Sequence, residues 1–254
     1  KDFSLVGIQF THYYQPSKNK EYRYIVKSFF EKLVESGHVK EKNIELPFCN
    51  NCDAYVNDAS IGGFCPKCNS YSVGNSCENC GYAANIVTGL KNIKCLQCNQ
   101  QITMTKKSLQ WCFQISNMRN ELKEYYDKVE MNDSLRGFLF KLIDDPLTEF
   151  NITQPSSWGI YVNDGSSEQT YHVWFEMAAM YWHYSSENHQ IIYTFGIDNR
   201  FYYAFLIPGL FMAAKMNYCL PFAFIQNDFY LLYGEKFSTS RQHAVWVNEI
   251  FSSH

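Results

Sequence analysis

The chain has 254 residues, a net charge of −3, and 46% hydrophobic and 17% aromatic residues. This composition supports a sizeable hydrophobic core, in one large domain or in a domain that carries an insertion. It excludes an overall basic field that would attract nucleic acid. No apolar run reaches the roughly 18 residues of a membrane span, and no signal peptide opens the chain. We therefore expect a cytoplasmic protein without a membrane partner.

The first predicted element is an amphipathic helix over residues 20–37, "KEYRYIVKSFFEKLVESG". Apolar residues recur at helical spacing along this segment, and Gly37 supplies a typical stop. The residues expected on the buried face are Tyr22, Val26, Phe29, Phe30 and Leu33.

Residues 45–100 are rich in Asn, Gly and Ser and contain four Cys-x-x-Cys pairs, which are 49/52, 65/68, 77/80 and 95/98. This spacing lets two thiolates of one tight turn bind the same tetrahedral ion, so four pairs predict two zinc sites. Disulfides are the alternative, but they need an oxidising compartment, for which nothing in the sequence argues. Sites made of four thiolates are closed, which favours a structural role. Cys112 and Cys219 stand apart and are predicted to be buried small hydrophobes.

The remainder of the chain predicts mostly alternating strands and helices. Residues 109–115 are predicted as a strand, Asn117 is expected to cap a helix over 118–130, and a second helix is expected over 134–145. Three strands then follow, over 171–175, 190–196 and 222–234; the first two lead into helices over 176–184 and 200–214, and the third into residues 235–241. Strand, glycine-marked turn and helix in succession indicate βα units and a mainly parallel sheet.

Taken in order, several segments resemble the methionyl-tRNA synthetases, which are class I synthetases. The cysteine-rich stretch "FCNNCDAYVNDASIGGFCPKCNSYSVGNSCENCG" resembles that family's zinc-bearing connective peptide. "NITQPSSWGIYV" resembles its Ile-Ser-Arg…Trp-Gly-Ile segment, and "YHVWFEMAAMY" its Tyr-Val-Trp-Phe-Asp-Ala segment. "FGIDNRFYYAFLIPGLFMAA" resembles its Gly-Lys-Asp-Ile motif and helix, and "YGEKFSTSR" its Lys-Met-Ser-Lys-Ser loop.

The resemblance implies an α/β fold: the second half of a Rossmann-type catalytic domain with an inserted zinc-knuckle subdomain. It divides the chain into a helical Rossmann-type part (1–44), the connective peptide (45–108), and the rest of the insertion with the second catalytic half (109–254). The family's His-Ile-Gly-His half is expected upstream or in a partner, and its anticodon-binding domain, which follows the last loop in the family, is expected to be absent. It also implies nested zinc pairing, with one ion on Cys65, Cys68, Cys77 and Cys80 and the other on Cys49, Cys52, Cys95 and Cys98.

The family joins an amino acid to the α-phosphate of ATP, with Mg²⁺, and releases pyrophosphate. By resemblance, Gly196 and Asp198 bind the ribose, although Asp198 could instead cap a helix together with Asn199. Lys236 matches the first lysine of the signature loop, whereas Thr239 stands where the second lysine contacts phosphate. Arg241 is a candidate to replace that charge and could equally be a solvated loop arginine.

The amino acid pocket implied by the resemblance contains Trp174, Tyr181, Tyr203 and Ile207. The two that match family aromatics, Trp174 and Tyr181, could also be ordinary core residues. Tyr203 replaces a histidine and Ile207 a tryptophan, while Met177 replaces an alanine and would crowd a methionine side chain. Two more family cations are lost, because Ile197 and Gln154 stand in place of a lysine and an arginine. We expect a different, smaller amino acid, or none.

Three functions remain open from the sequence. The first is ATP-dependent activation of an amino acid in a divergent methionyl-tRNA synthetase-like protein; charging of tRNA by this chain is doubtful. The second is a tRNA-independent relative that passes the activated amino acid to a small molecule, as in synthetase-like enzymes of nitrogen–nitrogen bond formation. The third is a non-catalytic, zinc-containing binding module, which the lost lysines favour.

Overall fold

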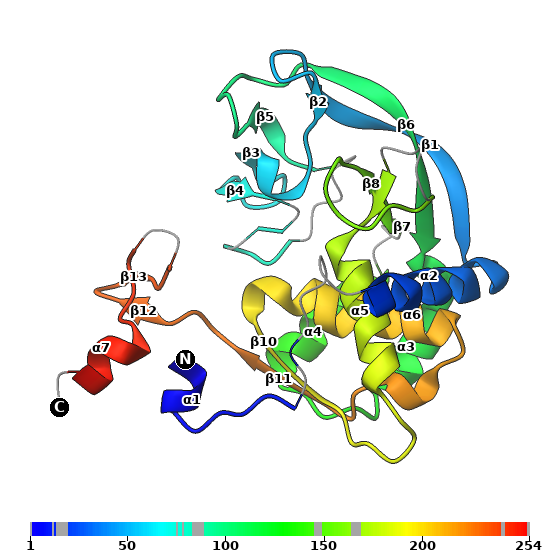
Figure 1. Ribbon diagram of the computed structural model, residues 1–254, viewed down its shortest axis with the longest axis vertical. Coiled ribbons are helices and arrows are strands. Elements are labelled where there is room, and N and C mark those ends of the chain that lie inside the picture. The colour runs from blue at the N-terminus through cyan, green and yellow to red at the C-terminus, as the bar shows by residue number, and fades with distance from the viewer. Residues whose placement is uncertain are drawn as a thin grey trace.

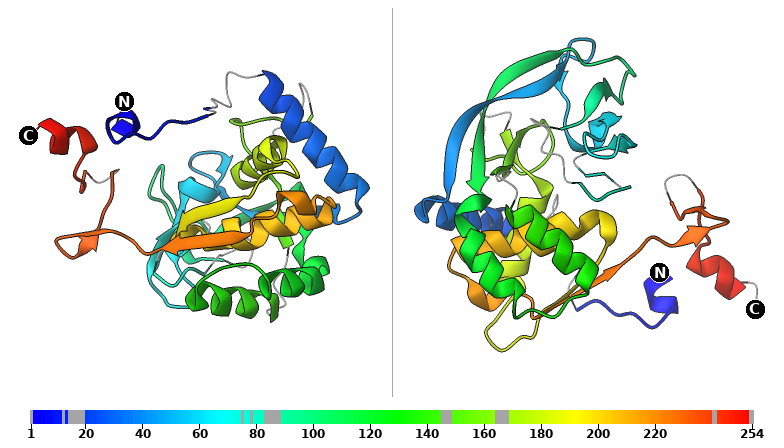
Figure 2. Two further views of the ribbon diagram at one scale, coloured as in Figure 1. Left: turned by 90° about the horizontal axis from the view of Figure 1, so that it is seen from below. Right: turned by 180° about the vertical axis from the view of Figure 1, so that it is seen from behind.

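The computed structural model describes residues 2–11, 13, 20–74, 76–77, 79–82, 89–144, 149–163, 169–239 and 242–252. A helical body lies at one end of the molecule and a cysteine-rich subdomain at the other, and a long two-stranded ribbon connects them (Figure 1). The short helices α1 (Asp2–Leu5) and α7 (Val247–Ser252) lie side by side away from the helical body in all views (Figure 2). Of the residues described, no helix is long and apolar enough to cross a membrane.

The predicted first helix is confirmed as α2 (Lys20–Glu35). Its buried residues include Ile25, whereas Phe30 is only partly buried, and Gly37 ends the segment with a φ of +76°. Phe29 is completely buried and its ring lies 5.4 Å from that of Phe175 and 6.0 Å from that of Phe211. These aromatic contacts hold α2 against α5 (Val173–Tyr184) and α6 (Ile207–Ala213).

The ribbon consists of β1 (Val39–Cys49) and β6 (Met104–Gln114), which pair antiparallel from Val39↔Phe113 to Phe48↔Met104. The predicted strand over 109–115 corresponds to the second half of β6. The ends of the ribbon pair with β2 (Ala54–Tyr55) and β7 (Glu149–Asn151). The ribbon therefore carries the cysteine-rich subdomain on two continuous strands rather than on a hinge-like loop (Figure 1).

The cysteine-rich subdomain contains a small antiparallel sheet in the order β4 (Tyr71–Val73), β3 (Ile61–Phe64) and β5 (Lys91–Cys95). Its described buried apolar cluster contains two cysteines, Cys49 and Cys95, and only two other residues, Val56 and Ile61. So small a core contributes little to stability, and the fold of this subdomain must depend on something else.

A parallel pair, β10 (Ile192–Gly196) and β11 (Ala223–Asn227), lies against the helical body. Within the described residues it is the only parallel pairing of two strands, and one isolated parallel bridge joins Glu130 to Ala223. The other described sheets are antiparallel, among them β8 (Thr153–Pro155) with β9 (Gln169–Tyr171) and β12 (Leu231–Leu232) with β13 (Glu235–Lys236). The chain is thus an α/β protein, and the wider Rossmann-type sheet stays a prediction.

Two local predictions are wrong. The expected strand over 171–175 ends at Tyr171, because His172 caps a helix: its Nδ1 accepts a hydrogen bond from the Trp174 amide at 3.3 Å. Asn117 caps nothing, since it lies within a 3₁₀ turn that leads directly into α3 (Arg119–Tyr126). The following helix, α4 (Asp133–Asp144), is confirmed, and Asn132 accepts a hydrogen bond from the Leu135 amide at its start.

Glu176, on α5, is 8% exposed and accepts a hydrogen bond from the Tyr22 hydroxyl at 3.1 Å. Burial raises the pKa of Glu176 to about 7, although hydrogen bonds from Tyr22 and the Ile160 amide oppose the shift. A raised carboxyl pKa means that the folded state favours the protonated form. The stabilisation from this group is complete below the ordinary pKa of 4.5 and is lost as the pH rises through 7.

The variant Glu176→Gln keeps an acceptor for both donors and cannot ionise. The difference in free energy of unfolding between the variant and the wild type should depend on pH. We expect it to shift in favour of the variant by about 1–3 kcal/mol from pH 5 to pH 8. Urea unfolding at the two pH values measures this difference. Glu187→Gln, an exposed substitution, is the control and should show none. An equal effect of Glu176→Gln at both pH values would contradict the assignment.

Candidate functional site

The eight paired cysteines gather into two groups in space. Within each group every Sγ atom lies within 4.8 Å of the others, and the groups are Cys49, Cys52, Cys95 and Cys98, and Cys65, Cys68, Cys77 and Cys80. These are the nested sets implied by the sequence resemblance. In both groups the first cysteine of each pair is buried and the second is partly exposed.

The sulfur spacing fits a tetrahedral zinc ion. The Cys49–Cys98 and Cys52–Cys95 Sγ atoms are 3.6 and 3.9 Å apart, and the Cys65–Cys80 and Cys68–Cys77 atoms are 3.7 and 3.6 Å apart. Four thiolates at about 2.3 Å from one zinc ion would lie about 3.8 Å from each other. A disulfide requires about 2.05 Å, so the distances disfavour bridges. Each group can hold one closed Zn²⁺ site.

Each Cys-x-x-Cys turn ends in a residue with left-handed backbone conformation. These residues, directly after the second cysteine of each pair, are Asp53, Asn69, Gly81 and Asn99, with φ between +48° and +67°. In three turns the amide of this residue donates to the carbonyl of the first cysteine, at 2.8–2.9 Å. Asn, Asp and Gly tolerate this conformation best. An Asn, Asp or Gly directly after the second cysteine of each pair is therefore a second sequence signal of metal-binding turns, in addition to the cysteine spacing.

The thiols differ in how readily they ionise. Hydrogen bonds, the largest from Asn79, lower the pKa of Cys68 to about 5, and a bond from the Gln100 amide lowers that of Cys98 to about 7. Burial raises the pKa of Cys80 to about 12, with contributions from the neighbouring thiols of its group. Each group thus contains one thiol whose pKa is lowered, Cys68 or Cys98, and one whose pKa is raised, Cys80 or Cys52. A bound cation would favour the thiolate form of its ligands.

We expect two zinc ions per chain in protein purified without added metal, because each group offers four sulfur ligands at zinc spacing. Elemental analysis by mass spectrometry measures the ratio. Cys112→Ser, which removes a buried thiol outside both groups, should leave the ratio unchanged. One zinc ion or none would contradict the two-site interpretation.

The second candidate site is the turn that follows β10. Gly196 ends the strand, and a Cβ atom there would lie 2.9 Å from Oδ1 of Asp198, so glycine lets this carboxylate fold back beside the strand end. The side-chain amide of Asn199 donates to Asp198 Oδ1 at 3.1 Å, and Lys236 Nζ lies 3.8 Å from Asp198 Oδ2. The structure thereby brings Lys236 beside the predicted ribose-binding residues Gly196 and Asp198.

Lys236 belongs to the hairpin of β12 and β13, and its Nζ also lies 3.9 Å from the centre of the Phe229 ring. Thr239 follows the hairpin and is exposed, and its carbonyl accepts a hydrogen bond from the Gln242 amide at 3.1 Å. Arg241 lies outside the described residues. The signature-loop residues that the structure describes therefore place one cation beside Asp198.

The residues predicted to line an amino acid pocket meet in an aromatic cluster between α5 and the π-helical turn Tyr202–Leu206. The Trp174 and Tyr203 rings are 5.4 Å apart, and the Tyr181 and Tyr203 hydroxyls are 3.4 Å apart. Trp174 stacks on Tyr202 with a ring separation of 4.0 Å. Ile207 is fully buried and presents no surface to a ligand in this structure. The other three residues are partly buried and could line an apolar pocket, whereas Ile207 is closed off from solvent.

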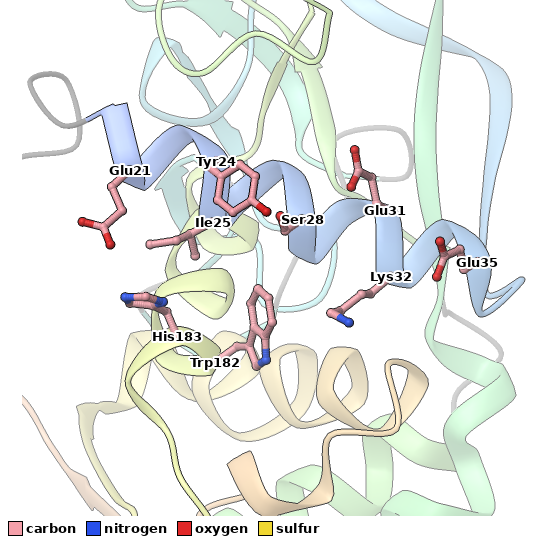
Figure 3. Close-up of a pocket in the computed structure, with 9 residues that line it drawn as sticks. All are labelled: Glu21, Tyr24, Ile25, Ser28, Glu31, Lys32, Glu35, Trp182 and His183. Atoms are coloured by element: carbon pink, nitrogen blue, oxygen red, sulfur yellow. The ribbon is translucent and has the colours of Figure 1, made fainter.

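A groove of about 440 Å³ lies elsewhere, between α2 and α5 (Figure 3). Three glutamates, Glu21, Glu31 and Glu35, line it together with Lys32 and Trp182. None of the nucleotide-, amino acid- or metal-binding residues predicted from the sequence lines this groove. Carboxylates repel phosphate, so the groove does not suit a nucleotide.

Comparison with known proteins identifies the family. The sequence profile described as "tRNA synthetases class I (M)" matches residues 1–254, the whole chain. The chain belongs to the methionyl-tRNA synthetase family. The similarity rests on the complete sequence and not on the cysteine motifs alone.

Methionyl-tRNA synthetases of archaea are among the similar sequences. The methionine–tRNA ligase of Methanococcus maripaludis is 28% identical in an alignment of 240 positions that covers 89% of this chain and 35% of that protein. The ligase of Korarchaeum cryptofilum is 26% identical in an alignment of 270 positions, gaps included, that covers 97% of this chain and 47% of that protein. The chain thus spans less than half the length of these relatives.

Among solved structures, the methionyl-tRNA synthetase of Mycobacterium tuberculosis in complex with methionyl-adenylate has a TM-score of 0.67. It is 13% identical, and the match covers 99% of this chain and 47% of that one. At this identity the likeness shows a shared fold. The chain therefore folds as part of a class I methionyl-tRNA synthetase-like α/β protein.

Proposed function

We propose that this chain is the part of an amino acid-activating enzyme that holds the ribose of ATP and the signature loop. The observation that carries the proposal is the meeting of Asp198 and Lys236 at the end of β10. Nucleotides bind at the carboxyl ends of parallel strands in α/β sheets, where a carboxylate can accept hydrogen bonds from both ribose hydroxyls. Membership of the methionyl-tRNA synthetase family supports the same reading.

In the proposed reaction an oxygen of the amino acid carboxylate attacks the α-phosphate of ATP, and pyrophosphate leaves with the electrons of the broken bond. The residues of this chain act by placement and charge. Asp198 holds the ribose, Lys236 faces the phosphates, and Thr239 donates one hydrogen bond without charge. Arg241 is the candidate for an additional phosphate contact. ATP would enter with Mg²⁺, which neutralises part of its charge.

We propose that the amino acid has an apolar side chain seated against Trp174, Tyr181 and Tyr203. The hydroxyls of the two tyrosines lie 3.4 Å apart. Because Phe195 stacks on one face of Tyr203 and Tyr202 on one face of Trp174, a ligand would use the opposite faces of these rings. Met177, partly buried on the same helix, would fill space at this end of the cluster. A side chain smaller than methionine fits this arrangement better, because overpacking costs about 1–3 kcal/mol.

The remaining assignments form one scheme. Two structural Zn²⁺ ions organise the subdomain, which we propose as an insertion over residues 45–108 between parts 1–44 and 109–254. Transfer of the activated amino acid from AMP to tRNA, and a further catalytic half outside this chain, belong to the same scheme. The tRNA-independent enzyme and the non-catalytic module considered above gain no support from the relatives found.

ATP–pyrophosphate exchange by this chain together with the further catalytic half, screened over the twenty amino acids, tests the proposal. We expect exchange with one apolar amino acid, and we expect it to fall by at least tenfold in Asp198→Asn, which loses the charge that accepts from the ribose. Asn199→Ala, which removes only a neighbouring amide, should lose less. Binding of AMP without exchange for any amino acid would favour the non-catalytic module.

A further inference from the structure

Arg200 connects the Asp198 turn with a cysteine knuckle 120 positions away in the sequence. It directly follows the 3₁₀ turn Ile197–Asn199 and is 8% exposed. Its Nη2 atom donates a hydrogen bond to the carbonyl of Cys80 at 2.8 Å. Cys80 is also one of the four thiols of the Cys65–Cys80 group. One side chain therefore spans from the candidate nucleotide turn to a candidate metal ligand.

The knuckle is shaped to receive this guanidinium. Gly81 has a φ of +67°, and a Cβ atom on it would lie 2.1 Å from Arg200 Nη2 and 2.6 Å from Cζ. On another side, Arg200 Cζ lies 3.7 Å from the centre of the Phe138 ring on α4. The planar group is thus held between a knuckle, an aromatic ring and a backbone carbonyl, an arrangement that suits arginine and not lysine.

The charges around Arg200 favour this position of its guanidinium group. Burial lowers the pKa of Arg200, whereas the nearby Cys80 and Asp228 oppose that shift. An arginine stays charged at any pH of interest. Thiolates that bind metal would carry negative charge beside it, so an ordered metal group and an ordered Arg200 stabilise each other.

We propose that Arg200 is a positioning residue that couples metal occupancy of the Cys65–Cys80 group to the placement of Asp198. Only Asn199 separates Arg200 from Asp198, and Arg200 directly follows the turn that carries Asp198. A knuckle that loses its metal releases the guanidinium, and the turn that carries the carboxylate loses its anchor. The part concerning Asp198 rests on the proposed nucleotide site, whereas the part concerning the metal does not.

Linkage makes the coupling reciprocal: a nucleotide on Asp198 must slow metal loss from this group and leave the Cys49–Cys98 group unaffected. Metal release to a colorimetric chelator measures this directly. Alkylation of freed thiols, located by mass spectrometry at Cys77 or at Cys95, shows which group opens. In the wild type we expect AMP to slow release from the Cys65–Cys80 group only.

In Arg200→Gln, release from the Cys65–Cys80 group should be about tenfold faster, as expected for the loss of one charged hydrogen bond. AMP affinity by calorimetry should fall about five- to tenfold, and AMP should no longer protect the metal. Arg200→Lys should restore only part of both effects. Arg136→Gln is the control, because Arg136 also donates to backbone carbonyls, those of Tyr126 and Val129, but contacts neither site.

Gly81→Ala should reproduce Arg200→Gln by expelling the guanidinium. Asn69→Ala imposes a similar backbone strain in the other turn of the same group without touching Arg200, and it should leave AMP affinity unchanged. Unaltered release kinetics in Arg200→Gln would overturn the proposal. If the wild type does not bind AMP, the nucleotide site fails while the metal result stands by itself. If AMP binds and Arg200→Gln binds it equally well, the coupling is wrong.

Discussion

Removal of zinc is expected to unfold the cysteine-rich subdomain and to leave the helical body folded. Besides its cysteines, the described part of residues 45–108 buries five apolar side chains, which are Leu46, Phe48, Val56, Ile61 and Leu90. Structural zinc supplies apparent binding free energies of about 10–16 kcal/mol in small metal-dependent domains. Burial of five apolar side chains supplies about 7–15 kcal/mol, which is too little to order so long a segment.

Hydrogen exchange with and without a strong chelator measures this effect by region. We expect loss of protection in β3, β4 and β5, and retained protection in α2, α5 and α6. The aromatic contacts of Phe29 with Phe175 and Phe211 involve no residue of the subdomain and should persist.

Single substitutions separate the two groups. Cys49→Ser and Cys77→Ser each remove one buried ligand from one group and should each cost one zinc ion and local protection. Cys112→Ser is the matched control, since this thiol is buried outside both groups and lies 3.2 Å from Asn151 Oδ1, which a hydroxyl can also contact. Full protection after chelation would show that the subdomain folds without metal. Collapse of the whole chain would show that the ribbon transmits the loss to the body.

The elements that the sequence predicts well are those decided by local chemistry. The helix at 20–35 follows from apolar spacing and from Gly37, and the cysteine pairs follow from the geometry of one tight turn. The strand expected over 171–175 failed for a local reason too. Val173, Trp174 and Phe175 favour strands intrinsically, but the side chain of His172 caps a helix at that point and tertiary packing buries Phe175.

The contacts that position the candidate site could not be predicted from spacing, because they join distant segments. Lys236 lies beside Asp198 although α6, β11 and β12 separate the two residues in the sequence. The family resemblance named both residues but did not predict that they meet. No feature of the sequence used for the predictions indicated the contact between Arg200 and Cys80. In retrospect only Gly81, a glycine at a position where the other turns carry Asn or Asp, indicates that something packs there.

The nucleotide site is expected to recognise adenosine while discriminating weakly among AMP, ADP and ATP. Asp198 supplies an acceptor for the ribose, and Lys236 beside it supplies one cation toward the phosphates. The phosphate end is poorer in charge, because Thr239 and Ile197 stand where the family has lysines. Calorimetry with the three nucleotides should give dissociation constants within about threefold of each other, since Lys236 is the one cation that the described residues place in an ion pair with Asp198.

Thr239→Lys should supply the missing charge. We expect it to tighten ATP binding by about five- to tenfold and AMP binding much less, because a hydrogen bond between charged groups contributes roughly 1.5–3 kcal/mol before solvent screening at this exposed position. The gain should decline with added salt. Thr239→Gln, similar in length but neutral, is the control and should leave the ratio of ATP to AMP affinity unchanged.

Asp198→Asn decides whether these effects belong to one site. It should weaken all three nucleotides by a similar factor of about ten, because each of them loses the same ribose contact. If it leaves AMP affinity unchanged, the ribose assignment is wrong and the Thr239→Lys result reports only a general attraction to phosphate. If wild-type ATP binds far more tightly than AMP, another cation already meets the phosphates. Arg241→Ala then tests the nearest candidate in the sequence, and a fall of ATP affinity to that of AMP would assign the charge to Arg241.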